Sequence, residues 1–159
     1  MLWNCKRCGS CCIKLPKRLQ LLNDEVEFFP KYSYENYLAG GFSKSDLKPI
    51  VYKLKKKRCP MYDEKVGCTI YENRPIVCKA FPVIINSLDG YCKNVKYEQG
   101  YSVPSELIVY AEERSKKFAL LINNIRENNM KLWVYKNSKW RIGNKKDLLK
   151  LFKLPKEFK

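Results

Sequence analysis

The most informative absence from this 159-residue sequence is histidine, which does not occur at all. Histidine is the usual general base near neutral pH and the commonest nitrogen ligand in protein metal sites. Its absence excludes Ser-His-Asp and Cys-His catalytic groups and the HExxH metalloenzymes. Any bound metal must therefore be held by thiolates, carboxylates or backbone oxygen atoms.

The sequence also lacks the long apolar runs of membrane and secreted proteins. No stretch approaches the roughly 18 to 20 apolar residues that a membrane helix needs, and the N-terminus has no apolar signal segment. The nucleotide-binding fingerprints GxGxxG and the P-loop are missing, as is the CxxxCxxC spacing of radical enzymes that use S-adenosylmethionine. We therefore expect a cytoplasmic protein without a membrane partner, and its catalytic residues, if it is an enzyme, are unknown.

Cysteine is abundant, with eight residues that all fall within the first 92 positions. In a reducing cytosol, dense cysteine indicates metal or redox chemistry more often than structural disulfides. We expect a cysteine-rich metal-binding region over 1–93 and a cysteine-free region over 94–159, packed together as one compact domain. The candidate metal ligands are Cys5, Cys8, Cys11, Cys12, Cys59, Cys68, Cys78 and Cys92.

Three of these cysteines, Cys5, Cys8 and Cys11, have the CxxCxxC spacing of bacterial ferredoxins. In that pattern a tight loop supplies three thiolates to one cluster, and the remote fourth ligand is followed by proline. Cys59 is followed by Pro60, so these four cysteines are the predicted cofactor ligands.

The vicinal residue Cys12 is harder to place, because side chains on adjacent residues diverge. We assign Cys11 and Cys12 to different centres, and the remaining four cysteines could then form a second set. One centre with the other cysteines buried as small apolar side chains is the alternative. Four thiolates suit either zinc or an iron–sulphur cluster. The CxxCxxC run favours one or two 4Fe-4S clusters over zinc.

The cysteine motifs resemble those of the zinc- or iron-chelating CxxCxxCC domain family, the YkgJ-like proteins often labelled Fe-S cluster oxidoreductases. The resemblance covers roughly residues 3 to 93 and rests on "CKRCGSCC", "CPMYDEKVGCTIYENRPIVCKAFPV" and Cys92. It implies a metal-binding domain with ligands among the eight cysteines, and it implies no particular reaction.

Within "YENRPIVCKAFP", Pro75 is placed to start a helical turn that carries Cys78. Arg74 precedes this proline, where its guanidinium could offset thiolate charge or hold a nearby carboxylate. We hypothesise that Arg74 supports the metal ligands, and a structural ion pair is the alternative.

The pattern of apolar residues predicts a small, metal-stabilised, mainly α (α+β) domain with cysteine-rich loops around one or two metal centres. Apolar residues at helical spacing predict one long helix from Pro104 to about Asn128. We then expect a short β-hairpin over 132–143 with a four-residue turn. A last helix should follow over about 145–153. Residues 23–29 have a helix start signal, and Pro30 should end that helix; residues 31–50 give no clear pattern.

The charge of the chain leads to a second set of expectations. The sequence contains 32 Lys or Arg residues and 16 acidic residues, a net charge of +16. Residues 131–159 carry ten basic and two acidic residues together with Trp133, Tyr135 and Trp140. Basic surfaces with interleaved aromatic residues bind single-stranded nucleic acid, whereas a solvated lysine face over packed aromatic residues is the simpler interpretation.

The sequence therefore predicts a basic protein that binds metal through cysteines. It favours an iron–sulphur protein that acts as an oxidoreductase component, in electron transfer or redox sensing. Such a protein would act with a redox partner protein. The alternative is a zinc-binding structural module that binds RNA or a protein partner through its basic C-terminal third.

Overall fold

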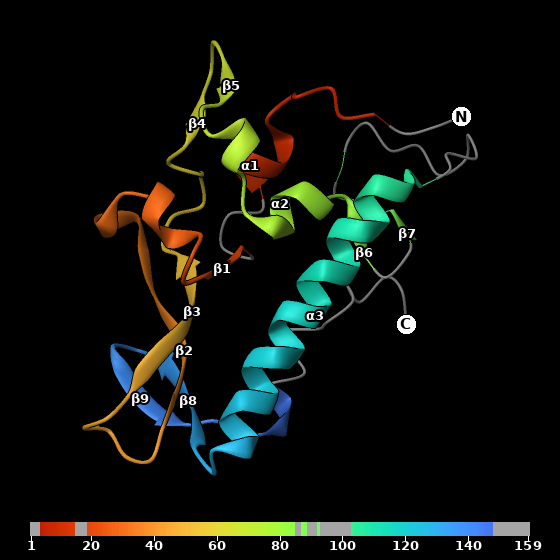
Figure 1. The fold of residues 1–159 in the computed structure, drawn as a ribbon. Coiled ribbons are helices and arrows are strands. Elements are labelled where there is room, and N and C mark those ends of the chain that lie inside the picture. The colour runs from red at the N-terminus through yellow and green to blue at the C-terminus, as the bar shows by residue number, and fades with distance from the viewer. Residues whose placement is uncertain (1–3, 15–18, 85–86, 89–91, 93–102, 148–159) are drawn as a thin grey trace.

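Five antiparallel strands and one long helix form the framework of the protein, seen here in a computed structural model (Figure 1). The structure describes residues 4–14, 19–84, 87–88, 92 and 103–147. The strand order in the sheet is β1-β3-β2-β8-β9, and each neighbouring pair is antiparallel. The strands are β1 (Gln20–Leu22), β2 (Tyr34–Gly41), β3 (Lys48–Leu54), β8 (Lys131–Lys136) and β9 (Lys139–Ile142). Strands from both sides of the expected boundary at residue 93 thus share one sheet.

The long helix is α3 (Ser105–Glu127), which confirms the helix expected from the apolar spacing. Pro104 is its N-cap residue, where the missing N–H costs no helical hydrogen bond. Phe118 and Ile125 are buried on this helix. Leu107 and Ala111, one and two turns from its start, pack near Cys92 instead. The two halves of α3 therefore contact different parts of the molecule.

The C-terminal hairpin is confirmed, with a shorter turn than expected. Lys136 and Lys139 are paired across β8 and β9, which leaves only Asn137 and Ser138 in the turn. Both have positive φ, 51° and 60°, as the two central residues of a type I′ turn require. The two lysines that we placed in the turn therefore belong to the strands.

The sheet corrects the expectation of a mainly helical domain. Residues 31–50 were without a clear pattern, yet they contain all of β2 and the start of β3. The register between these strands shifts between Asn36 and Leu38 and again at Ala39. These irregularities break the alternation of apolar and polar residues on which strand prediction depends.

The helix expected over 23–29 is also wrong, because only a short 3-10 turn, η2 (Val26–Phe28), forms there. Glu25, within the segment expected to be helical, is buried, and its carboxylate accepts the backbone N–H groups of Leu22 and Ile76. Asn144 caps the residues that follow β9 through hydrogen bonds from the N–H groups of Lys146 and Asp147. The rest of the expected last helix, over 148–153, lies outside the described residues.

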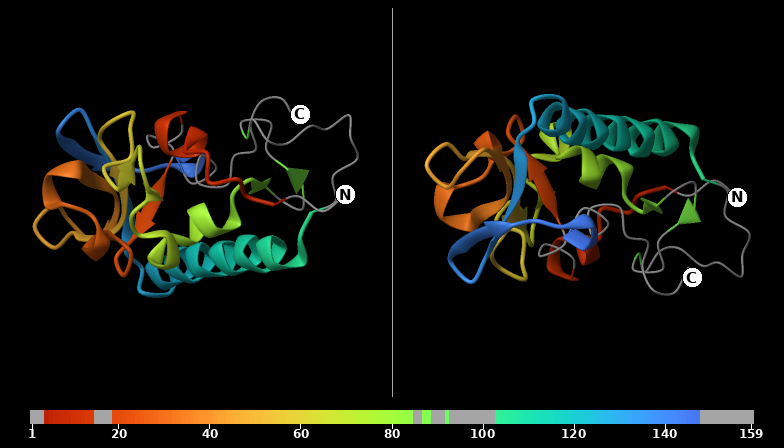
Figure 2. Two further views of the ribbon diagram at one scale, coloured as in Figure 1. Left: turned by 90° about the horizontal axis from the view of Figure 1, so that it is seen from above. Right: turned by 90° about the horizontal axis from the view of Figure 1, so that it is seen from below.

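Three apolar clusters hold these elements together. The first lies between the sheet and α3 and contains Leu38, Val51 and Phe118. The second surrounds Val83 and Cys92, and the third includes Leu21, Leu54 and Cys59. Figure 2 shows α3 running along one side of the molecule, past the sheet and the cysteine-bearing segments. Among the described helices, none is long and apolar enough to cross a membrane.

Candidate metal centre

All eight cysteines line one cavity of about 110 Å³ beside the sheet. Its remaining walls are largely apolar, and the charged side chains that line it are Lys6, Arg7 and Arg74. No acidic side chain of the described residues contributes to its wall. The cavity therefore combines soft sulphur donors with positive charge.

Cys5 and Cys8 lie on a loop that leads into a short helix, α1 (Ser10–Lys14), and Cys11 and Cys12 lie in the first turn of that helix. The loop turns at Gly9, whose φ of +73° lies in the left-handed region that glycine tolerates. A methyl group on Gly9 would overlap the ring of Tyr62. The Ile13 N–H then donates to the Gly9 carbonyl at 3.1 Å and closes the first helical turn. Gly9 thus sets the direction in which Cys11 and Cys12 enter the cavity.

Cys59 and Cys68 come from the next segment, which is hydrogen-bonded to this loop. The Cys59 N–H donates to the Cys12 carbonyl at 2.8 Å. A small hairpin of β4 (Tyr62–Asp63) and β5 (Gly67–Cys68) follows, so Cys68 returns toward Cys59. The loop between the strands is held by Asp63, whose side chain accepts the N–H groups of Lys65 and Val66.

Cys78 lies on α2 (Ile76–Ala80), and Pro75 is the N-cap of this helix as expected from the sequence. The Cys78 N–H donates to the Pro75 carbonyl at 2.8 Å. Glu25 holds the start of α2 from the other side, because its carboxylate accepts the Ile76 N–H at 2.7 Å and the Leu22 N–H at 2.8 Å. Burial raises the pKa of the Glu25 carboxyl, and these two hydrogen bonds oppose that rise.

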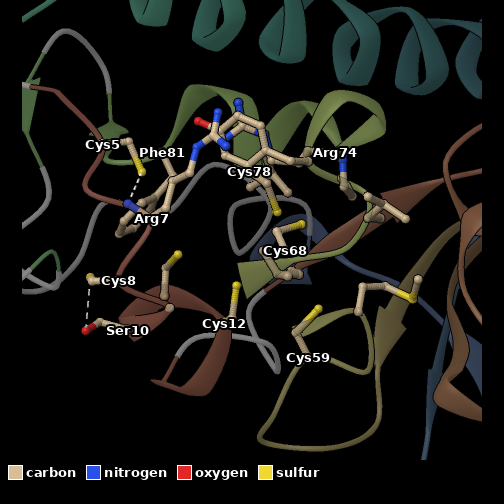
Figure 3. A pocket seen from close by; sticks show the side chains of 18 of the residues that line it. Cys5, Arg7, Cys8, Ser10, Cys12, Cys59, Cys68, Arg74, Cys78 and Phe81 are labelled. Atoms are coloured by element: carbon tan, nitrogen blue, oxygen red, sulfur yellow. Dashed lines mark hydrogen bonds between the residues drawn. The ribbon is translucent and has the colours of Figure 1, made fainter. Parts of the chain in front are cut away.

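Five cysteines interact electrostatically inside the cavity, and we call them the inner cysteines: Cys11, Cys12, Cys59, Cys68 and Cys78. Figure 3 shows the sulphur atoms of four of them, Cys12, Cys59, Cys68 and Cys78, directed toward a shared space. The fifth, Cys11, lies close enough to Cys12 that the two thiols shift each other's pKa.

The protonation of the inner cysteines depends on how they share hydrogen bonds. A hydrogen bond with the Cys12 thiol lowers the pKa of Cys11 and that of Cys59 to about 7. The same contacts raise the pKa of Cys12, which keeps its proton. Burial raises the pKa of Cys68 and of Cys78, while Arg74 opposes the rise in both. A thiolate at Cys11 or at Cys59 is thus accessible near neutral pH, and thiolate is the form that binds metal.

The other three cysteines, Cys5, Cys8 and Cys92, are the outer cysteines. The Cys5 sulphur accepts the Arg7 N–H at 3.4 Å, and the Cys8 thiol donates to the Ser10 hydroxyl at 3.5 Å (Figure 3). Cys92 is buried in the apolar cluster with Val83, against which Cys5 also packs.

This grouping differs from the sets inferred from spacing. Cys12 and Cys59, which we placed at different centres, lie close enough to shift each other's pKa. Cys5 and Cys8 instead make hydrogen bonds within their own loop, to Arg7 and Ser10. Among the described residues, no three Cys, Asp or Glu side chains lie close enough to hold one metal ion as they are placed. The identity of the ligands therefore stays a prediction.

A stack of three side chains borders the cavity. The guanidinium carbons of Arg7 and Arg74 lie 3.8 and 3.7 Å from the ring centroid of Tyr71. At such short distances the two planar groups must occupy opposite faces of the ring. The Arg74 Nε is buried without a hydrogen-bond partner among the described residues. The stack joins the N-terminal cysteine loop to the segment that carries Cys68 and Cys78.

These supporting residues could be predicted only in part from the sequence. Tyr71 and Arg74 lie in the C-x-I-Y-x-x-R-P-x-x-C motif, and Arg7 lies between two cysteines, but nothing in the spacing shows that they stack. For Glu25 no signal was available, because its partner Ile76 lies 51 residues away.

The predicted RNA-binding residues lie on the β8–β9 hairpin, at the opposite end of the molecule from the cysteine loop (Figure 1). Trp133 is buried, and its indole Nε1 donates to the Gly41 carbonyl at 3.1 Å. The rings of Tyr135 and Trp140 pack edge to face with centroids 5.1 Å apart. Trp133 is therefore engaged in the sheet and is not placed to stack on a base.

Comparison with known protein families matches residues 4–101 to the family named CxxCxxCC, whose description reads "Putative zinc- or iron-chelating domain". No curated protein matches the sequence. No solved structure matches it either.

Proposed function

Because this chain belongs to the zinc- or iron-chelating CxxCxxCC family, which supports metal binding, we propose that it holds an iron–sulphur cluster and transfers single electrons. Such a cluster, when bound, accepts and releases one electron without a change in the protein's covalent structure. The proposed ligands come from the inner cysteines. Redox sensing would use the same chemistry, with the change of charge read out by a partner.

The observation that carries this proposal is the space that the cysteines enclose. The cavity of about 110 Å³ is far larger than the roughly 10–15 Å³ that one water molecule needs. A single zinc ion with four thiolates lies about 2.3 Å from each sulphur and is enclosed by its own ligands. A cluster of several iron and sulphide ions needs room of its own, with each cysteine bound to a different iron. The separation of the thiols and the volume between them both favour a cluster.

The charges around the cavity suit a centre that gains negative charge when reduced. Lys6, Arg7 and Arg74 line the cavity without an acidic neighbour in its wall. Positive charge favours the reduced, more negative state and so raises the reduction potential. The apolar walls limit the access of water, which strengthens this effect.

Anaerobic purification followed by assays of iron, acid-labile sulphide and zinc tests the proposal. We expect a brown protein with about four irons and four sulphides per chain, since four thiolates complete a cubane cluster. Eight irons would instead indicate two clusters and a role for the outer cysteines. A colourless protein with stoichiometric zinc and no sulphide would refute the electron-transfer function.

Arg74 is proposed to stabilise the thiolates, because its charge lowers the pKa of Cys11 and opposes the rise in Cys68 and Cys78. We expect Arg74→Gln to lower the reduction potential by on the order of 40 mV, equivalent to about 1 kcal/mol for one electron. Arg74→Lys keeps the charge but loses the planar stack on Tyr71 and should lower metal content. Arg126→Gln, at the far end of α3, is the control for loss of one positive charge. Unchanged metal content and potential in both Arg74 variants would remove this role.

The zinc-binding alternative, with RNA bound by the basic C-terminal third, is tested by the same preparation. Lys136 and Lys139 are exposed at the hairpin, where they could contact phosphates. RNA binding by phosphate contacts must weaken steeply as salt rises. Binding that is absent or insensitive to salt would exclude this alternative.

A further inference from the structure

The exposed charged residues of the N-terminal cysteine segment, residues 4–14, are all basic. Over residues 4–14 the exposed side chains are those of Asn4, Lys6, Arg7, Ile13 and Lys14, and we call this set the cysteine-loop surface. It contains three cations and no anion. Ile13, with 48% of its surface exposed, adds an apolar residue among them.

The same segment carries most of the cysteines that reach toward solvent. Of the six cysteines that are only partly buried, four lie in this segment, namely Cys5, Cys8, Cys11 and Cys12, and the other two are Cys68 and Cys78. Cys59 and Cys92 are buried on the side of the apolar clusters. Electron transfer between proteins slows steeply with distance. The cysteine-loop surface therefore offers a short route between the cavity and a docked protein.

The cations of this surface have no carboxylate partner within the described part of the chain, since no salt bridge there involves Lys6, Arg7 or Lys14. By contrast, Arg58 near Cys59 pairs with Glu64 at 3.1 Å. Unpaired surface cations around an apolar residue are typical of small, transient interfaces, where charge steers the encounter.

From these observations we propose that the cysteine-loop surface docks an acidic one-electron carrier protein. The proposal rests on the proposed cluster. One electron passes between the carrier and the metal centre, so that one is oxidised by one electron and the other reduced by one. No bond is made or broken and no proton is required.

The test uses an acidic plant-type ferredoxin as the probe, with anaerobically purified, cluster-loaded protein. The reduction potential of the loaded protein and of each variant is measured first, because Lys6 also lines the cavity and its loss changes the driving force. Stopped-flow absorbance then follows transfer in the favourable direction at several salt concentrations, and rates are compared at equal driving force. The docking variant is Lys6→Glu with Lys14→Glu. Its control is Lys136→Glu with Lys139→Glu at the tip of the β8–β9 hairpin, which changes the net charge by the same amount.

At low salt we expect the docking variant to lower the second-order rate constant about tenfold. The hairpin variant should lower it less than about threefold. The difference between the two variants should vanish at high salt, because salt screens the charges. Rates are normalised to iron content, and the matching Lys→Gln pairs replace any Lys→Glu variant that loses iron. Equal effects of the two pairs would overturn the docking surface, as would the absence of transfer to a loaded, reducible protein. A preparation without iron and sulphide would instead refute the proposed function on which this surface depends.

Discussion

Cys12 is the residue on which the assignment of the metal ligands depends. Its thiol lowers the pKa of both Cys11 and Cys59, and its carbonyl accepts the Cys59 N–H. Residue spacing alone placed it at a different centre, because neighbouring side chains usually diverge. The spacing could not show that the Cys59 segment lies against it, since that contact joins residues 47 positions apart.

Serine substitutions distinguish the two groupings of cysteines. We expect Cys12→Ser and Cys78→Ser to lose most of the bound metal, because both lie among the inner cysteines. Cys8→Ser should retain the larger part, since its thiol points to Ser10. Metal content per folded chain is the measurement. If Cys8→Ser loses the metal while Cys12→Ser keeps it, the ligand set inferred from the CxxCxxC spacing is the correct one.

Gly9 and Gly67 allow backbone strain to be separated from side-chain overlap. Both have positive φ, +73° and +82°, but a methyl group on Gly67 would meet only the Arg7 carbonyl at 3.8 Å. We expect Gly67→Ala to cost about 1 kcal/mol from strain alone. Gly9→Ala should cost about 2 to 3 kcal/mol, because the Tyr62 ring must also move. Urea unfolding of the metal-loaded variants measures both.

A double variant provides the control for this comparison. Adding Tyr62→Ala to Gly9→Ala removes the overlap, so the two substitutions should cost less together than the sum of their separate effects. Strict additivity would show that Tyr62 does not restrict the cysteine loop.

At the level of elements, α3 and the β8–β9 hairpin were predictable because their patterns are local. Leu107, Phe118 and Ile125 repeat at helical spacing, and all lie within one element. The β2–β3 pair was not predictable, because Gly40 and Gly41 offer no side chain to the pattern and the register shifts near Leu38. The short turn at 23–29 depends on Glu25, whose partner comes from α2.

Glu25 links the turn after β1 to the helix that carries Cys78. We expect Glu25→Ala to cost about 2 to 4 kcal/mol, because two buried N–H groups lose their acceptor. Glu113→Ala on the exposed face of α3 removes only an exposed contact to Lys117 and should cost less than about 0.5 kcal/mol. Urea unfolding compares the two, and equal costs would show that Glu25 does not hold α2.

The raised pKa of Glu25 also predicts a pH dependence. A carboxyl whose pKa is higher in the folded state binds more protons there than in the unfolded state. Stability is therefore lost as pH rises from the ordinary carboxyl pKa through the raised one. Glu25→Gln removes this titration, so the stability of the wild type relative to this variant should fall over that window. A difference that is constant with pH would contradict the raised pKa.

At the scale of the whole molecule, the apolar cluster between the sheet and α3 is separate from the two clusters that contain cysteines. Among the described residues, the cluster of Leu38, Val51 and Phe118 contains no cysteine, whereas the other two contain Cys92 and Cys59. Metal binding should therefore stabilise one end of the protein more than the other.

Hydrogen exchange after metal removal tests this division. We expect the amides of Leu38 and Val51 to keep their protection, because the sheet and α3 do not depend on the metal. The amides of Cys59 and Cys78, whose partners are Cys12 and Pro75, should exchange faster by a factor of about ten or more. Mass spectrometry of peptides from both regions measures this. A uniform loss of protection would show that the whole chain unfolds as one unit.

The two contact regions of α3 have a consequence for the length of that helix. Leu107 and Ala111 face the cluster around Cys92, while Phe118 faces the sheet. Each residue turns an α-helix by about 100°, so one residue inserted between Ala111 and Phe118 would rotate these two faces out of phase. Relatives of this protein should thus vary in length at the exposed turn between β2 and β3, and keep the number of residues between the two faces of α3 constant.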